Sequence, residues 1–458
     1  MWQTLAPEVV IEILRHFLPD SKLSLTKPQQ FPWYLGHVCR IWRGVFLSFP
    51  QFWTTFIIDI TENFQVGDLE RAPMILKTCL TERGGGLPIS FKFSAVSLPY
   101  CDRPSLSQYL GVLYCGQILD ILVAHSARWH DAYFTLPATQ LRTIYHVKDR
   151  VPILRSFQLT LNDKPTKDVE FCNHLLVTAS QLRRVYLHDT EFKLWKANWS
   201  SLTTIHFKYP ILPTMLLSSL KRTSCLEELV IRQDYGSDFE LSSISPIALP
   251  FLRVLHAPSL DTLPLLEMHA LEDLFVRNDL CIIPTDNPIM EMINTSTFRS
   301  LPRLRRLSII PEDEGDLAQL IQFMPASVQD LSVYGDLAIF LRVISESSTA
   351  RNLKMLTVAT WYPLEFHEYT LLSRITSWRR ETTGIGPFEN LMRLSLVLPQ
   401  EDWAQNGNSD TQIAATPEEF VKLLGHHLEE EGIQYSIQFV DAESADQFAD
   451  SHLQFNLL

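Results

Sequence analysis

The sequence of 458 residues contains little glycine and none of the glycine-rich motifs that hold phosphate groups. Glycine accounts for 16 residues, about half of the usual proportion of roughly 7%. The patterns G-x-x-x-x-G-K-[ST], G-x-G-x-x-G and G-x-S-x-G are all absent, so neither a nucleotide-binding loop nor the nucleophile elbow of a hydrolase has support in the sequence. We find no catalytic constellation, expect no cofactor, and predict that the chain is not an enzyme.

Cysteine is also sparse and irregularly spaced. The seven cysteines include no C-x-x-C pair, and successive ones are 14 or more positions apart. This arrangement is unlike a disulfide framework or a zinc module, so we expect reduced and mostly buried thiols. His367 and Glu368 begin like a zinc-protease helix, but Leu371 stands where the second histidine is needed. We therefore predict no metal site.

Long uncharged hydrophobic runs are missing as well. No such run reaches the roughly 20 apolar residues of a membrane helix, and the apolar stretch near the N-terminus contains Glu8, Glu12 and Arg15, which a secretory signal excludes. We expect no membrane partner and a cytoplasmic or nuclear location. The net charge is 39 − 52 = −13, which disfavours binding to nucleic acid. Most of this excess lies in residues 401–458, which hold twelve acids and one base, Lys422.

Two amphipathic segments near the N-terminus are predicted to be helices. The first covers residues 5–18, and its apolar side chains fill an arc of about 200° at 100° per residue, twice the stripe that a surface helix needs. Its own domain and a second surface must both cover such a helix, although burial against the rest of this chain alone remains the alternative. The second helix, over residues 35–48, has a narrower stripe, packs on one face and ends at Pro50.

The N-terminal segment resembles an F-box, especially the F-box-like type of mushroom-forming fungi. The resemblance is carried by Trp2-Gln3-Thr4-Leu5-Ala6-Pro7-Glu8-Val9-Val10, Glu12-Ile13-Leu14, Leu35-x-x-Val38-Cys39-x-x-Trp42-Arg43 and Pro50-x-x-Trp53. It implies docking on the Skp-type adaptor of a cullin-RING ubiquitin ligase, which would cover the surplus apolar surface of the first helix. By position in the motif, the implied adaptor contacts are Leu5, Pro7, Glu8, Ile11, Leu14, Val38 and Trp53, and the implied internal residues are Cys39, Trp42 and Phe46.

A second pattern, L-x-x-L-x-L, recurs ten times along the rest of the chain. The mean spacing is (391 − 154)/9, about 26 residues, which lies within the range of about 20 to 29 for leucine-rich repeats. Each strand would point its alternate apolar residues into a solenoid core, and segments such as 213–223 and 315–323 would return as helices. The ten repeats begin at Leu154, Leu182, Leu202, Leu226, Leu252, Leu271, Leu304, Val328, Leu353 and Leu391, and Trp129-x-x-Ala132-x-Phe134 is a candidate for a degenerate first unit.

These patterns together predict an α/β chain in four parts. A short helical F-box-like module covers residues 1–55, and a bridging segment, with a strand at 87–93 and a helix at 107–125, covers 56–128. An irregular leucine-rich-repeat solenoid follows over 129–400, with protruding loops at 277–300 and 360–390. An acidic α/β cap at 401–458 contains a helix from Thr416 to Glu431, an edge strand at 435–440 and a final helix at 443–453.

The functional expectation is a substrate-recognition subunit of an SCF-type cullin-RING ligase. The F-box-like module would dock on the Skp-type adaptor, and the repeat domain would bind a target protein whose identity the sequence does not name. The principal alternative is a leucine-rich-repeat interaction scaffold without a ubiquitin-ligase role. A third possibility is an F-box receptor that holds a small ligand in its solenoid.

Overall fold

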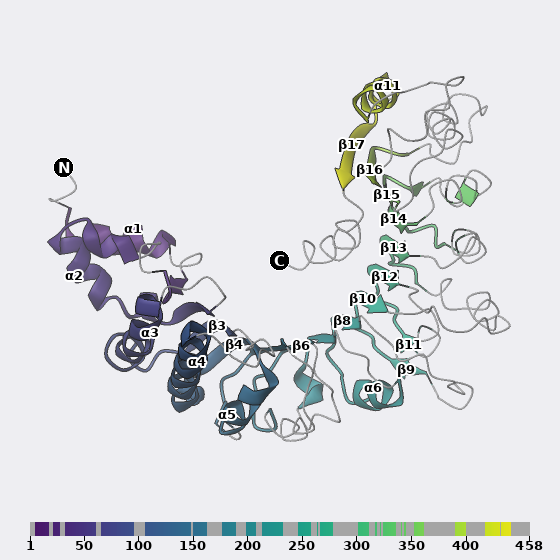
Figure 1. Cartoon of the computed structure of the whole chain (residues 1–458). Coiled ribbons are helices and arrows are strands. Elements are labelled where there is room, and N and C mark those ends of the chain that lie inside the picture. Colours follow the sequence, from purple (N-terminus) through teal and green to yellow (C-terminus); the bar gives the residue numbers. More distant parts are fainter. Residues whose placement is uncertain are drawn as a thin grey trace. The chain divides into compact units, whose positions relative to one another are not determined.

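The structure is a computed structural model of the whole chain (Figure 1). The described residues are 5–17, 22–27, 33–60, 66–95, 106–147, 150–162, 176–188, 198–207, 213–231, 246–257, 263, 266–277, 301–310, 317, 321, 324–335, 340, 343–344, 352–360, 390–399, 417–430 and 432–440. The chain forms two compact units, unit 1 (Met1–Leu226) and unit 2 (Glu227–Leu458).

Unit 1 is a ladder of parallel strands flanked by helices. Its strands are β1 (Leu23–Ser24), β2 (Thr55–Ile60), β3 (Ile89–Ala95), β4 (Trp129–Leu136), β5 (Ser156–Leu161), β6 (Arg184–His188) and β7 (Thr204–Phe207), each parallel to the next. Its α-helices are α1 (Pro7–Phe17), α2 (Arg40–Ser48), α3 (Val66–Thr78), α4 (Leu106–Ala124), α5 (Leu141–Tyr145) and α6 (Pro213–Leu220). Short 3₁₀ and π turns occur at Trp33–His37, Pro50–Trp53, Cys79–Arg83, Ser126–Arg128, Ala138–Gln140 and Trp199–Ser201.

Unit 2 repeats the same arrangement with little regular helix among its described residues. Strands β8 (Glu228–Ile231), β10 (Val254–Ala257), β12 (Asp273–Arg277), β13 (Arg306–Ile310), β14 (Asp330–Tyr334), β15 (Met355–Ala359), β16 (Arg393–Pro399) and β17 (Gln434–Val440) pair in parallel in that order. The two short strands β9 (Ile247–Ala248) and β11 (Leu266–Glu267) pair separately, and helix α11 (Pro417–Glu430) precedes β17.

The parallel order shows that the chain is a leucine-rich-repeat-like solenoid, because strands that follow one another in sequence can pair in parallel only if every connection returns on the same side. The predicted repeats are in register. Phe157 pairs with Val185 and Val185 with Ile205 in unit 1; Leu307 pairs with Leu331 in unit 2. The first residue of all ten predicted repeats is buried, which confirms the repeat prediction.

The ladder begins earlier than the repeat pattern indicates. Trp129, Ala132 and Phe134 are buried in β4, as expected for a degenerate first unit. Strands β2 and β3, within the segment that the sequence suggested to be a bridge, pair in parallel with each other and with β4. These two strands of the predicted bridge therefore continue the ladder.

Aromatic side chains fill the core of unit 1 where the later repeats have leucine. The ring of Trp129 lies 5.3 Å from that of Phe91 and 5.4 Å from that of Phe134, and its Nε1 donates to the carbonyl of Leu122 at the end of α4. The adjacent Arg128 donates to the carbonyls of Leu87 and Leu80. The Leu80 carbonyl belongs to the turn Cys79–Arg83, which follows α3. The positive guanidinium of Arg128 interacts favourably with the negative end of the helix dipole there, so it joins the end of this helical segment to the ladder.

The second N-terminal helix differs from its prediction. One continuous helix over 35–48 is wrong: a 3₁₀ turn at Trp33–His37 is followed by α2, and Cys39 between them is extended, with φ −162° and ψ 176°. Gly36 in the turn lies so close to the Phe46 ring that a Cβ there would be 3.4 Å away. The break allows the turn and α2 to pack against each other, and Arg43 Nε donates to the Gly36 carbonyl.

At the other end, α11 and β17 lie where the sequence predicts a helix and an edge strand. The helix ends before Gly432, whose φ of +69° is the left-handed conformation that glycine adopts at helix ends. Strand β17 pairs with β16 over seven residues. The predicted loops at 277–300 and 360–390 lie almost entirely outside the described residues, as do the predicted final helix at 443–453 and all but Leu317 and Ile321 of the predicted helix at 315–323.

Candidate functional site: three interaction surfaces

The first surface is the N-terminal module, defined as residues 5–53. Helix α1 packs against α2 and buries Val10 and Leu14 completely, whereas Val9 on the same helix is 46% exposed. The wide apolar arc of this helix is thus only partly covered by its own chain. A single exposed apolar residue such as Val9 is common on protein surfaces. Three further apolar residues of the same module are exposed, however: Tyr34, Val38 and Ile41.

Of the seven residues implied to contact the adaptor, the structure leaves some accessible and buries others. Val38 is 48% exposed, Pro7 and Glu8 are exposed, and Leu5 and Ile11 are half-buried. Leu14 and Trp53, however, are 0% and 3% exposed. Both side chains contribute to the core of the module, so they offer no free surface to a partner.

The three implied internal residues lie in or beside this core. Trp42 and Phe46 are buried and Cys39 is half-buried. The Phe46 ring lies 4.9 Å from that of Trp53, whose Nε1 donates to the Phe46 carbonyl at 3.2 Å. Aromatic pairs of this kind add about 0.5–1.5 kcal/mol beyond the burial of their area, so the Pro-x-x-Trp part of the motif serves to hold the module together.

The second surface is the strand face of unit 1, defined as the side chains that alternate with the buried rows on β2–β7. Register places these side chains in rows across neighbouring strands. One row contains Ser90, Asp131, Ser156, Arg184 and Thr204, and the next contains Lys92, Tyr133, Gln158, Tyr186 and His206. Tyr133 and Tyr186 in the second row and Arg184 in the first belong to residue types that are enriched at protein–protein interfaces.

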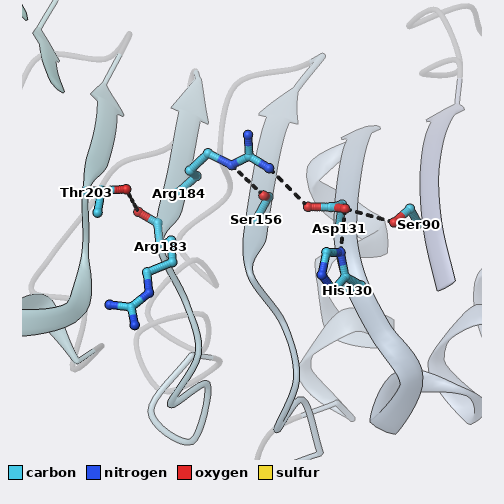
Figure 2. Close-up of polar contacts among 7 residues, drawn as sticks. All are labelled: Ser90, His130, Asp131, Ser156, Arg183, Arg184 and Thr203. Atoms are coloured by element: carbon cyan, nitrogen blue, oxygen red, sulfur yellow. Dashed lines mark hydrogen bonds and ion pairs between the residues drawn. The ribbon is translucent and has the colours of Figure 1, made fainter. Parts of the chain in front are cut away.

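Asp131 is the centre of a polar network in the first row (Figure 2). Its Oδ2 accepts a hydrogen bond from Ser90 Oγ at 2.9 Å and lies 2.7 Å from His130 Nδ1. Its Oδ1 lies 3.4 Å from a terminal nitrogen of Arg184, whose Nε donates to Ser156 Oγ at 2.8 Å. These groups come from four different strands, so the network joins β3, β4, β5 and β6 at one level of the ladder.

Serine, histidine and aspartate are all present in this network, but not in the order that hydrolysis needs. In a catalytic triad the imidazole lies between the carboxylate and the hydroxyl and accepts the hydroxyl proton. Here the Ser90 hydroxyl and the His130 imidazole both contact the same oxygen of Asp131. This arrangement orients side chains on a surface and does not activate the serine as a nucleophile.

The network determines the ionisation of Asp131. Burial raises the pKa of this carboxyl, but hydrogen bonding to Ser156, His130 and Ser90 lowers it more, so the pKa is below its ordinary value. A carboxyl with a depressed folded-state pKa contributes stability above its unfolded-state pKa, near 4, and loses that contribution as the pH falls through the folded-state value.

We therefore expect Asp131→Asn to lower the free energy of unfolding by about 1.5–3 kcal/mol at pH 7, the typical value for hydrogen bonds to a charged group. The difference from the wild type should be smaller at pH 3, because the carboxyl of the unfolded wild-type chain, with a pKa near 4, is then largely protonated and part of the stability that depends on its charge is lost. Urea unfolding at both pH values measures it, with the exposed carboxylate of Asp120 changed to Asn as the control. If Asp131→Asn lowered the free energy of unfolding equally at both pH values, the charge of the Asp131 carboxylate would not be the source of its stabilising effect.

The third surface is the strand face of unit 2, which differs in character. Its first row carries charges of both signs, and Arg306 Nε lies 3.2 Å from Asp273 Oδ2. The second row, towards the carboxyl ends of the strands, is made of small hydroxyl side chains on five consecutive strands: Ser308, Ser332, Thr357, Ser395 and Ser436.

An apolar cluster lies beside the hydroxyl row. It consists of Phe275, Tyr334, Ala359 and Val397, with Ile310 packed against it. These positions alternate with the core leucines of their strands and so point away from the solenoid core, yet the four are between 1% and 8% exposed. Burial raises the pKa of Tyr334 to about 12.

The remaining chemistry of the described residues is limited. No group of three histidine, cysteine or acidic side chains in these ranges could hold a metal ion. Burial raises the pKa of both Cys79 and Cys115 to about 12, so these thiols are protonated and poor nucleophiles at neutral pH. Cys39 and Cys225 are free; the other three cysteines lie outside the described ranges.

No helix in the described part of the chain combines the length and the apolar character that a membrane crossing requires.

Sequence reasoning missed three features of these surfaces. Tyr34 and Ile41 were not assigned to the module surface, although both follow the pattern of an exposed apolar residue beside a buried one. The Asp131 network joins residues up to 53 positions apart, and only the strand register could have brought them together. The apolar cluster of unit 2 is hard to recognise in the sequence because its members adjoin core residues in short apolar runs such as Leu396–Leu398, which show no alternation between the two faces of the strand.

Comparison with known proteins does not assign the chain to a family. No family model matches the chain, and no curated protein matches it. Among solved structures, one similar chain is a protein from Bacteroides fragilis, with 11% identity over 73% of this chain and 84% of that one and a TM-score of 0.34. Another is the leucine-rich repeat-containing protein LegL7 from Legionella pneumophila, with 13% identity over 80% of this chain and 87% of that one and a TM-score of 0.29.

Proposed function

We propose that this chain is a non-catalytic receptor that joins a cullin-RING ubiquitin ligase to a target protein. Its N-terminal module would dock on the Skp-type adaptor, and the strand faces of its solenoid would bind the target. The observation that carries the proposal is the exposed apolar surface of the module, at Val9 and Val38, within the segment whose motif resembles an F-box.

The burial pattern distinguishes residues that form the core of the module from residues that are available to a partner. Val10, Leu14, Trp42 and Trp53 hold the helices and turns together, so the module keeps its shape without a partner. Val9, Val38 and Ile41 are exposed rather than part of that core, and exposed apolar side chains that form a contiguous patch mark interaction sites.

The solenoid supports the second half of the proposal. The strand face of unit 1 presents polar and aromatic rows and that of unit 2 presents charged and hydroxyl rows, and solenoids use extended surfaces of this kind to bind other proteins. The contribution of a receptor to the reaction is proximity: it holds the target near the transfer machinery and makes an intermolecular step effectively intramolecular. No nucleophile or acid–base pair on this chain is required.

The experiment is a binding titration of the full chain against the Skp-type adaptor of its own organism. The double variant Val9→Asp/Val38→Asp should bind at least about 30-fold more weakly than the wild type, which corresponds to the roughly 2 kcal/mol of an interface hot spot. Both positions are exposed, so the fold should survive the change. A matched control is Val177→Asp, an exposed valine outside the module, which should bind like the wild type.

Two results would contradict the proposal. If the folded wild type does not bind at micromolar concentrations, the F-box resemblance is one of sequence only, and a leucine-rich-repeat scaffold without a ligase role takes its place. If the wild type binds but Val9→Asp/Val38→Asp binds equally well, the adaptor contacts another surface, and the assignment of the module is wrong.

A further inference from the structure

Three arginines lie side by side at the amino ends of two neighbouring strands of unit 1, and we call them the arginine edge. Arg155 directly precedes β5, and Arg183 and Arg184 stand at the start of β6. The Arg155 carbonyl accepts hydrogen bonds from the backbone nitrogens of Arg183, at 2.8 Å, and of Arg184, at 3.0 Å. All three residues are exposed, so the edge presents three positive charges to solvent.

The described residues compensate only one of these charges with an ion pair. Arg184 lies 3.4 Å from Asp131 Oδ1, and Arg183 donates from a terminal nitrogen to the Ser201 carbonyl, which carries no charge. Within the described ranges, the Arg155 side chain has neither an ion-pair nor a hydrogen-bond partner. Figure 2 shows Arg183 turned away from the network that holds Arg184. Because like charges on neighbouring strands repel, a partner with negative charge would stabilise this edge.

The same repeat positions in unit 2 balance their own charge. Each is the residue that follows the first apolar residue of a repeat, and backbone hydrogen bonds align these residues across neighbouring strands. In unit 2 the row begins with Glu227, Arg253, Glu272 and Arg305. Arg253 pairs with Glu272 through two contacts, of 3.2 and 3.0 Å. In unit 1 the row is His130, Arg155, Arg183 and Thr203. The alternation of sign is therefore absent there, and two arginines are neighbours.

The two units also differ in net charge. Unit 1 contains 24 lysines and arginines and 17 acids, a net charge of +7, whereas unit 2 contains 15 and 35, a net charge of −20. An acidic partner is therefore attracted by unit 1 and repelled by unit 2. A nucleic acid is a poorer candidate for the arginine edge, because a chain with a net charge of −13 repels a long polyanion as a whole.

We propose that the arginine edge binds an acidic segment of the target protein through the aspartate and glutamate side chains of that segment. The proposal rests on the proposed function and deepens it, because it names the chemistry of the target that the strand face of unit 1 receives. Guanidinium groups suit this task, since each can donate two parallel hydrogen bonds to one carboxylate.

The spacing of the arginines fits an extended acidic segment. Neighbouring strands lie about 4.8 Å apart, and alternate side chains on one side of an extended segment lie about 6.7 Å apart. Long arginine side chains can span this difference, so Arg155 and Arg183 can each take one carboxylate. Arg184 is already oriented by Ser156 and Asp131, which lie 2.8 and 3.4 Å from its guanidinium nitrogens. An oriented side chain loses less conformational entropy on binding.

The test is fluorescence anisotropy of fluorescein-labelled hexaglutamate, titrated with the full chain at about 50 mM salt, where charges are weakly screened. The wild type should bind with a dissociation constant below about 100 μM. Arg155→Gln/Arg183→Gln should bind at least about tenfold more weakly, because it removes two charged donors. The matched control, Arg253→Gln/Arg305→Gln, removes the same charge from the same repeat positions of unit 2 and should bind like the wild type.

The titration contains no adaptor, so failure of adaptor docking contradicts the ligase role, whereas failure of this titration contradicts the chemistry of the target. Equal binding by the wild type and Arg155→Gln/Arg183→Gln, or no binding by the wild type at about 100 μM, would overturn the proposal. A thymidine oligonucleotide that displaces the probe at a lower concentration than unlabelled hexaglutamate does would overturn it too, because nucleic acid would be the better ligand. The same holds for a wild-type dimer in sedimentation that Arg155→Gln/Arg183→Gln dissociates, since the acidic unit of a second copy would then occupy the edge.

Discussion

Trp129→Ala is expected to lower the free energy of unfolding of unit 1 by about 3–5 kcal/mol, the range for deleting a large aromatic side chain from a packed core. Trp129 is completely buried, contacts the rings of Phe91 and Phe134, and donates its Nε1 hydrogen to the Leu122 carbonyl. The change removes all of these interactions and leaves that carbonyl without this donor. The loss should appear as a lower urea midpoint for the transition of unit 1, followed by circular dichroism.

The control for this experiment lies on the neighbouring helix. Leu113 in α4 is an exposed apolar residue, and Leu113→Ala should change the same free energy by no more than about 0.5 kcal/mol, as is usual for a surface site. A loss below about 1 kcal/mol for Trp129→Ala would fall well short of the usual cost of an aromatic truncation. It would mean that Trp129 does not pack in the core of unit 1 as the structure shows.

Leu331→Ala should lower the free energy of unfolding of unit 2 by about 2–5 kcal/mol. Leu331 is 1% exposed and pairs with Leu307 on one side and Leu356 on the other, so its removal opens a cavity in a continuous row of leucines. The transition of unit 2 in urea measures the loss.

The next residue in the chain provides the control for that change. Ser332 points to the strand face and is half-buried, so Ser332→Ala should stay within about 0.5 kcal/mol of the wild type. If the two neighbouring substitutions cost the same, the assignment of core and strand face along β14 would be incorrect, because a shift of one residue exchanges the two faces of a strand.

The repeats could be predicted from the sequence because their signal is local and recurrent. Leu182, Val185 and Leu187 lie within six positions, and the same spacing returns in nine other places, so the strand and its inward face follow together. The L-x-x-L-x-L pattern does not identify strands β2 and β3, because no leading leucine precedes their buried residues Phe56, Ile58, Phe91 and Phe93. Their alternation predicts a strand but does not place it in the ladder.

The N-terminal module shows a different limit. The periodicity of α1 correctly indicated more apolar surface than one packing partner can cover, but it could not tell which part of the arc faces the rest of the chain. Leu14 and Val9 have equivalent apolar character in the sequence, and only the position of α2 makes one core and the other surface. The break at Cys39 was missed for a related reason, since the contact of Gly36 with Phe46 is tertiary.

Adaptor docking and target binding are proposed to use separate surfaces, and hydrogen exchange tests this most directly. The full chain should be compared with and without the Skp-type adaptor, by mass spectrometry of peptides from both units. We expect slower exchange in α1 and from Trp33 to Ser48, with no change in β4–β6 or β12–β16. Protection confined to those strands, or no protection anywhere at saturating adaptor, would contradict the account.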